Sequence, residues 1–254
     1  MKAFDLPDLN ATLRYLDLPG AGPPLVFIHG LGCAGSYDYP IVAADPVLAG
    51  CRKIIVDLLG NGYSDRPADF SYTVEAQAAV LARLLESLDL EGVYLYGHSA
   101  GGAVAMQVVR LVADRIKGVV LSEANLEPSP PRAFSFQIAS DSEADFVSHG
   151  LDRLLKRLKR ISPGWLPTFS TALPAGLWRF SASLKAGSTP TGRELFYAFS
   201  GTKAYIIGAR TRDPDRREMP AHGIPVHIVS NAGHAMAWEN PAGLAAAIAR
   251  SIET

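Results

Sequence analysis

The chain has 254 residues, of which 48% are hydrophobic and 19% are charged, and its formal net charge is −1. This composition excludes intrinsic disorder, which needs few apolar residues and a strong net charge. A net charge so close to zero gives no overall field that would attract nucleic acid. The two cysteines, Cys33 and Cys51, cannot form a disulfide scaffold, and they fit a reducing compartment.

The N-terminal segment and the hydrophobic runs predict a soluble, cytoplasmic protein. Residues 1–15 carry two aspartates and lack an apolar segment of signal-peptide length. No apolar run approaches the roughly 18 residues that suggest a membrane span. We therefore expect a small molecule as the partner, and neither nucleic acid nor a membrane. The sequence leaves the oligomeric state open.

The first half of the chain alternates strand patterns with helical patterns. Short apolar runs predict strands at Leu25–Ile28, Lys53–Val56, Val93–Tyr96 and Gly118–Leu121. Apolar residues at helical spacing predict a helix over Val74–Leu88, with Thr73 as its N-cap, and another over Ala100–Val112. Near-continuous apolar strands that alternate with helices indicate an α/β protein, in which helices cover both faces of a mostly parallel sheet.

The pattern changes after Glu123. Residues 134–205 hold 11 of the 22 aromatic residues of the chain, and the strand pattern stops. Within this region, apolar residues at helical spacing predict a helix over Leu151–Ile161. The opposite face of that helix carries arginine and lysine, and we interpret it as a solvated face rather than an anion-binding one.

Strand patterns resume in the last quarter of the chain, at Ala204–Ile207 and Val226–Val229. A final helix is predicted over Pro241–Ile252, because proline favours the first position of a helix. We therefore divide the chain into an α/β core, residues 1–125 and 202–254, and a helical, aromatic-rich insertion, residues 126–201.

The segment Gly97-His98-Ser99-Ala100-Gly101 stands between a predicted strand and a predicted helix. A serine on such a tight turn takes a strained backbone conformation, and flanking glycines remove the clashes that this creates. We interpret Ser99 as a candidate nucleophile, with an ordinary glycine-rich turn as the alternative. A phosphate site is disfavoured, because no P-loop lysine follows and the dinucleotide glycine spacing is absent.

A second glycine-rich turn, His29-Gly30-Leu31-Gly32-Cys33, follows the first of the predicted strands. The backbone amide of Leu31 can face the same point as that of Ala100, and two such donors make an oxyanion hole. We interpret His29 as a structural histidine that binds nearby loop backbone, with contact to the substrate as the alternative. Cys33 is expected to line the site.

His234 is the candidate general base. It lies in the loop Asn231-Ala232-Gly233-His234, after the last predicted strand, where a histidine can reach across the top of the sheet. The other histidines suit this role less well. In particular, His98 lies inside the glycine-rich turn around Ser99 and is expected to point elsewhere.

Together these features resemble the α/β-hydrolase fold family over nearly the whole chain. The His29-Gly30 turn, the segment 57–64, the Gly97–Gly101 turn and the Gly233-His234 pair occur in the order of that family. In the family the serine precedes the acid and the histidine comes last. The resemblance implies that residues 126–201 form a helical cap. Five aromatic residues of the cap could line an apolar pocket or merely join cap to core: Phe134, Phe136, Trp165, Trp178 and Phe196.

The acid of the implied catalytic triad has two candidates. The family usually places it a few residues beyond a glycine, where this chain has Thr211, three residues after Gly208. Asp213 lies two residues further on, among arginines with which it could form ion pairs. Glu123 ends the Gly118–Leu121 strand region beside Ser99, and some family members take their acid from that position. We favour Glu123 and keep Asp213 as the alternative.

The resemblance implies a serine hydrolase that needs no cofactor and cleaves an ester-like bond through an acyl-enzyme. Serine at position 99 argues against the dehalogenases and epoxide hydrolases of the fold, which use aspartate there. No cluster of candidate ligands has metal-site spacing, so no metal is expected. The alternatives are an acyl-lactone or amide hydrolase, a carbon–carbon bond hydrolase, a perhydrolase, and a small-molecule receptor that keeps the fold without turnover.

Overall fold

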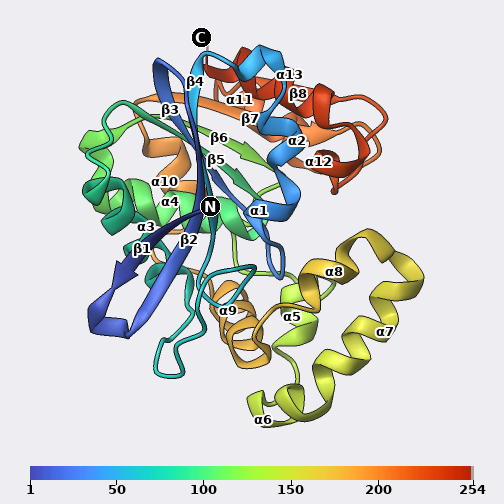
Figure 1. Cartoon of the computed structure of the whole chain (residues 1–254). Coiled ribbons are helices and arrows are strands. Elements are labelled where there is room, and N and C mark those ends of the chain that lie inside the picture. The colour runs from blue at the N-terminus through green and yellow to red at the C-terminus, as the bar shows by residue number, and fades with distance from the viewer. Residues whose placement is uncertain (253–254) are drawn as a thin grey trace.

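Across residues 1–252, which the computed structural model describes, eight strands form one sheet (Figure 1). The strands are β1 (Lys2–Leu6), β2 (Ala11–Leu18), β3 (Gly22–Ile28), β4 (Cys51–Asp57), β5 (Val93–His98), β6 (Ile116–Ser122), β7 (Thr202–Gly208) and β8 (Val226–Val229). Their order across the sheet is β1-β2-β4-β3-β5-β6-β7-β8. The pairs β1–β2 and β2–β4 are antiparallel, and all other neighbours are parallel. The mostly parallel sheet expected from the sequence is therefore confirmed.

The six predicted strands correspond to β3 to β8, and the sequence pattern missed β1 and β2. In β2, buried residues alternate with partly buried ones, so Ala11, Leu13 and Tyr15 face the core. This alternation is typical of an antiparallel strand with one face toward solvent. The predictions relied on continuous apolar runs, which mark only strands that are buried on both faces.

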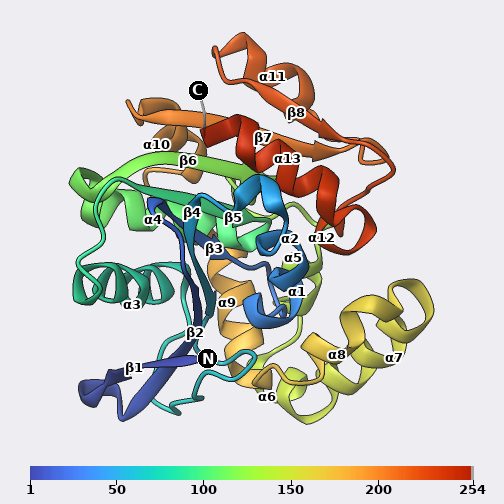
Figure 2. The ribbon, with the colours of Figure 1, turned by 45° about the horizontal axis from the view of Figure 1, so that its top comes forward.

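Helices cover both faces of the sheet (Figure 2). They are α1 (Gly35–Asp38), α2 (Pro40–Ala43), α3 (Val74–Ser87), α4 (Ala100–Val112), α5 (Phe134–Ile138), α6 (Glu143–Asp145), α7 (Leu151–Ile161), α8 (Leu166–Phe169), α9 (Pro174–Ala186), α10 (Gly192–Ala198), α11 (Asp215–Ala221), α12 (Met236–Glu239) and α13 (Pro241–Ile252). Residues of α3, α4, α10 and α11 pack into one core, and residues of α2, α12 and α13 into the other.

The two cores follow from the period-two geometry of the strands. In β3, Val26 and Ile28 lie in the core under α3 and α4, whereas Leu25 and Phe27 lie in the core under α13. Successive side chains of a strand point to opposite faces, so a continuous apolar run supplies both cores at once. Thr73 caps α3 as predicted, because its hydroxyl accepts a hydrogen bond from the amide of Ala76 at 3.2 Å.

The helices between β6 and β7 divide into two groups. Residues of α5, α7 and α8 form a separate apolar cluster that includes Leu158 and Phe169, and α7 and α8 project away from the sheet (Figure 2). In contrast, α10 packs beside α4, and Phe196 is fully buried in the main core. We call α5 to α9 the lid. The predicted boundaries of the insertion, at residues 126 and 201, stay predictions.

Of the helices in the described part of the chain, none has the length and apolar character that crossing a membrane requires.

Candidate active site

Ser99 occupies the sharp turn between β5 and α4, with a φ of 52° and a ψ of −120°. A positive φ is strained for a residue with a side chain, so the neighbours must leave the backbone room. A Cβ atom on Gly97 would lie 2.8 Å from the carbonyl oxygen of Gly101, and one on Gly101 would lie 2.3 Å from that of Ile28. The two glycines therefore permit the turn that presents Ser99, as their spacing in the sequence predicts.

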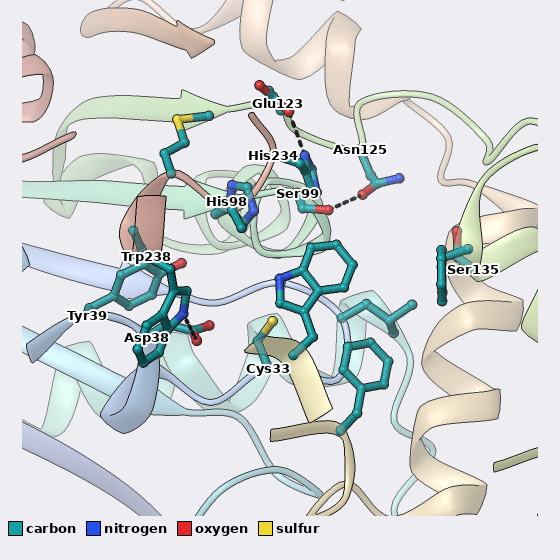
Figure 3. A pocket seen from close by; sticks show the side chains of 18 of the residues that line it. Cys33, Asp38, Tyr39, His98, Ser99, Glu123, Asn125, Ser135, His234 and Trp238 are labelled. Carbon is teal, nitrogen blue, oxygen red and sulfur yellow. Dashed lines mark hydrogen bonds and ion pairs between the residues drawn. The ribbon is translucent and has the colours of Figure 1, made fainter. Parts of the chain in front are cut away.

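The carboxylate of Glu123 lies beside the imidazole of His234 (Figure 3). His234 Nδ1 donates a hydrogen bond to Glu123 Oε2 at 2.6 Å, and the amide of Gly208 donates to Oε1 at 2.9 Å. Glu123 follows β6 and His234 lies in the loop after β8, so the parallel sheet brings their strand ends to one edge. Burial opposes ionisation of Glu123, but the hydrogen bond and charge of His234 hold the pKa of this carboxyl below its ordinary value.

Asp213, the alternative acid, forms no hydrogen bond with His234 among the described residues. Its Oδ1 accepts a hydrogen bond from the amide of Asp215 at 2.9 Å, at the start of α11, and burial raises its pKa. The ion pair of Asp213 with neighbouring arginines, the alternative role that the sequence offered, is not present within residues 1–252. Instead Arg193, from α10, pairs with Asp215 at 2.9 Å and with Glu218 at 3.2 Å. Local sequence did not indicate this pairing, because Arg193 reaches α11 from a distant part of the chain.

The two predicted oxyanion donors flank Ser99. Ala100 is the first residue of α4, and Leu31 lies in the turn after β3, on the wall of the same cavity as Ser99. Among the described residues, neither amide donates a hydrogen bond to a protein acceptor. The N-terminus of a helix carries partial positive charge, so an anion between these amides would be stabilised.

A cavity of about 270 Å³ opens above Ser99, between the carboxyl edge of the sheet and the lid. Three of the residues predicted to contact substrate line it: Cys33 from the core, and Phe134 and Trp165 from the lid. Trp165 lies across from His234, with ring centroids 6.0 Å apart, and stacks on Phe169 at 6.2 Å. The lid side of the cavity is therefore mainly aromatic and apolar.

The prediction that His29 could contact substrate is wrong. His29 is fully buried, its Nδ1 donates to the carbonyl oxygen of Gly30 at 2.8 Å, and its Nε2 accepts from the amide of Leu58 at 3.0 Å. Both ring nitrogens thus hold loop backbone, which is the structural role favoured from the sequence. Phe196 also does not line the cavity, because α10 packs it into the main core.

Two further aromatic residues expected in the pocket lie outside it. The ammonium group of Lys185 lies over the ring of Phe136, 4.4 Å from the ring centroid. The indole nitrogen of Trp178 donates to the carbonyl oxygen of Asp141 at 2.9 Å, which joins α9 to the segment before α6. Both residues therefore contribute to contacts within the lid, and aromatic composition alone did not separate them from Phe134 and Trp165.

Sequence reasoning missed Asn125. The hydroxyl of Ser99 donates to Asn125 Oδ1 at 3.2 Å (Figure 3). The backbone amide of Asn125 also donates to the carbonyl oxygen of Ser99, at 3.0 Å. Asn125 lies two residues after Glu123 on the same loop, and this proximity to a candidate acid was the available signal. In this conformation the serine hydroxyl is turned to Asn125 rather than to His234.

The expectation that His98 points away from the site is also wrong. Its ring centroid lies 4.6 Å from that of His234, and its Nδ1 is hydrogen-bonded with the hydroxyl of Ser122 at 2.9 Å. Burial, together with the neighbouring His234, lowers the pKa of His98 to about 3. His98 is therefore uncharged near neutral pH.

Residues 23–232 match the sequence profile of the alpha/beta hydrolase fold. The chain belongs to this family. Within the part of this alpha/beta hydrolase that the structure describes, no group of three or more histidine, cysteine, aspartate or glutamate side chains could hold a metal ion.

Two curated relatives show the range of activities found in similar proteins. The chain is 29% identical to a 2-hydroxy-6-oxo-2,4-heptadienoate hydrolase from Pseudomonas putida over 181 residues. This match covers 65% of each of the two chains. The chain is 31% identical over 137 residues to haloalkane dehalogenase 2 from Mycobacterium bovis, which covers 52% of this chain and 46% of the relative. The matches thus span less than two thirds of either relative.

Solved structures with the same fold cover nearly the whole chain. An N-acyl homoserine lactonase, AidH, in complex with N-hexanoyl homoserine matches with a TM-score of 0.79 at 19% identity, over 99% of this chain and 96% of that one. A thermophilic esterase from Thermogutta terrifontis with malate bound matches with a TM-score of 0.77 at 23% identity, over 96% and 93% of the two chains. At these identities the likeness concerns the fold.

Proposed function

We propose that this alpha/beta hydrolase is a serine esterase that cleaves small, partly apolar esters through an acyl-enzyme. The observation that carries the proposal is Ser99 on a strained turn at the floor of a cavity, beside a His234–Glu123 pair at 2.6 Å. In this proposal Ser99 is the nucleophile, His234 the general base and Glu123 the acid of the triad. No cofactor takes part.

The first step requires a rotation of the serine side chain away from Asn125. The hydroxyl leaves Asn125, turns to the Nε2 atom of His234 and gives up its proton as Oγ attacks the ester carbonyl. Glu123 accepts from the Nδ1–H of His234, so Nε2 is the free base and the imidazolium that forms is stabilised. The amides of Leu31 and Ala100 hold the oxyanion of the tetrahedral intermediate.

The second step returns the proton. His234 protonates the leaving alcohol, a water molecule then takes its place, and the same histidine activates that water to release the acid. The ring of His98 lies beside the imidazole of His234, with ring centroids 4.6 Å apart. Because His98 stays neutral, it adds no charge that would repel the imidazolium of His234.

The size and lining of the cavity favour a small acyl group. About 270 Å³ is near the lower end of ligand pockets. Phe134, Trp165, Phe169 and Leu184 supply apolar lining on the lid side. An acyl chain of a few carbons would bury its apolar surface against these rings.

Serine at the position of attack also separates this proposal from dehalogenation. One curated relative is a haloalkane dehalogenase. The family resemblance implies an aspartate at the position of attack in such enzymes, where this chain has Ser99. The similarity to a 2-hydroxy-6-oxo-2,4-heptadienoate hydrolase makes cleavage of a carbon–carbon bond the second candidate. Lactones, amides, perhydrolysis and a receptor without turnover are the remaining alternatives.

The proposal is tested by substituting Ser99. Ser99→Ala should lower kcat for p-nitrophenyl butyrate by about 10⁶-fold, as removal of the nucleophile does in other serine hydrolases. A fluorophosphonate probe should label wild type at Ser99. The matched control is Ser140→Ala, an exposed serine in the lid whose hydroxyl donates to the carbonyl oxygen of Phe136; it should keep full activity and labelling.

Two outcomes would contradict the assignment: an alanine variant that keeps most of its turnover, or a label on another residue. A substrate panel of p-nitrophenyl esters of graded length, lactones, aryl amides and a vinylogous diketone separates the ester proposal from its alternatives. A ligand that binds and is released unmodified would favour the receptor.

A further inference from the structure

The core side of the cavity has a polar end that the proposed mechanism does not use. Asp38, Tyr39 and Trp238 lie together on one side of Ser99, with Cys33 below, whereas Asn125 and Ser135 lie on the other side (Figure 3). Asp38 ends α1 and Tyr39 follows it directly. A carboxyl group in a cavity with an aromatic lining needs a partner, because burial of an unpaired charge is costly.

The partners of Asp38 within the protein are neutral and do not fill its capacity. The indole nitrogen of Trp238 donates to Asp38 Oδ1 at 3.0 Å, and Cys33 lines the same cavity. A carboxylate offers about four acceptor positions, so further donors can bind. Within residues 1–252, no lysine, arginine or histidine nitrogen forms an ion pair with Asp38. Burial raises the pKa of Asp38, and burial with Asp38 nearby keeps the Cys33 thiol protonated.

Tyr39 provides an independent observation at the same end of the cavity. Its side chain is buried, and its hydroxyl has no hydrogen-bond partner among the described residues. The ring packs between two other aromatic rings, with its centroid 5.3 Å from that of Phe27 and 5.6 Å from that of Tyr96. Buried polar groups are almost always hydrogen-bonded, so a hydroxyl without a partner beside a cavity points to a bound group.

We propose that Asp38 and Tyr39 form a subsite that binds a hydroxyl group of the substrate. A hydroxyl has one donor and two acceptor positions, so it can donate to Asp38 and accept from Tyr39 at once. An ammonium group could donate to Asp38 and to the Tyr39 oxygen, but it offers no acceptor for the Tyr39 O–H. Trp238 holds the carboxylate by its hydrogen bond, and its ring packs at a tilt against that of Tyr37, with ring centroids 4.7 Å apart. The substrate class is thus a hydroxylated ester, an inference that rests on the proposed esterase function.

The test compares pairs of esters that differ by one hydroxyl. The acyl pairs are p-nitrophenyl butyrate with 3-hydroxybutyrate, and p-nitrophenyl hexanoate with 6-hydroxyhexanoate; the alcohol pair is propyl with 3-hydroxypropyl butyrate. In at least one pair wild type should favour the hydroxylated member about 10- to 100-fold in kcat/KM, as expected for a hydrogen bond to a charged group. Equal rates in all three pairs would overturn the subsite.

Variants locate the preference. Asp38→Leu should abolish it, and Tyr39→Phe, which removes only the orphan hydroxyl, should weaken it several-fold. If Asp38→Leu does not fold, the milder Asp38→Asn should reduce the preference while retaining the shape of the side chain. The matched controls are Asp69→Leu and Tyr63→Phe, at exposed positions outside the cavity, which should leave the preference unchanged. A preference that survives both Asp38 substitutions would also overturn the proposal.

The two proposals fail in different ways. If wild type hydrolyses none of the six esters, the esterase function is wrong. If it hydrolyses the plain esters but shows no preference for a hydroxyl, only the Asp38–Tyr39 subsite is wrong.

Discussion

Glu123 combines a short-range feature with a long-range one. Its position after β6 is local and could be recognised in the sequence, whereas its two partners, His234 and the amide of Gly208, come from the far end of the chain. Both carboxylate oxygens are therefore fixed, one toward the imidazole and one toward β7. Such a carboxylate can hold one tautomer of the histidine and stabilise its cation.

We predict that Glu123→Gln leaves the protein folded and lowers kcat by roughly 10⁴-fold, because the amide would favour the wrong tautomer of His234, as in a related triad. The control is Asp213→Asn, which should cost little activity, since Asp213 bonds the amide of Asp215 and lies outside the cavity. Steady-state kinetics measures kcat of the two variants, and circular dichroism checks that both are folded. A larger loss in Asp213→Asn than in Glu123→Gln would transfer the acid assignment to Asp213.

At the scale of elements, some lid residues hold the lid helices together and others form the wall of the cavity. The apolar cluster of the lid, with Leu158 and Phe169, holds α7 and α8 together, while Trp165, directly before α8, faces His234 across the cavity. Trp178, on α9, instead bonds the segment before α6. The same residue type thus forms the cavity wall at one position and a lid contact at another.

Alanine substitutions should separate these two roles. Trp165→Ala enlarges the cavity, so the ratio of kcat/KM for octanoate over butyrate esters should rise about 10-fold or more, the usual scale for a change in pocket volume. Trp178→Ala should leave that ratio unchanged and lower the melting temperature more than Trp165→Ala does. A shift in chain-length preference in Trp178→Ala alone would contradict the assignment of Trp165 to the wall.

At the scale of the whole molecule, packing of the site against the core makes stability depend on pH. The pKa of His98 is about 3 in the folded protein and 6.5 for an unperturbed histidine. Between these values the unfolded chain binds a proton that the folded chain does not, so stability falls as the pH decreases. The lowered pKa of Glu123 acts in the same direction below its ordinary value, because protonation weakens its bond with His234.

We therefore predict that His98→Gln flattens the loss of stability in acid. From pH 7 to pH 5, wild type should lose up to about 2 kcal/mol more of its unfolding free energy than the variant, since each unit below 6.5 contributes about 1.4 kcal/mol. Urea unfolding at both pH values measures this. His149→Gln, at a position whose side chain is 71% exposed, is the control and should follow wild type. Identical pH profiles for wild type and His98→Gln would refute the linkage.

The sequence by itself determined the parallel part of the sheet, helices α3, α4, α7 and α13, and the positions of Ser99 and His234 as candidates, because these depend on local patterns. Continuous apolar runs mark strands buried on both faces, and glycines mark turns that a side chain would block. Only the tertiary structure decided which aromatic residues line the cavity, that His29 binds backbone, that Asn125 binds Ser99, and that Asp38 lines the same cavity. Those outcomes depend on contacts between residues far apart in the chain, and no local pattern records which distant segment will pack against a given side chain.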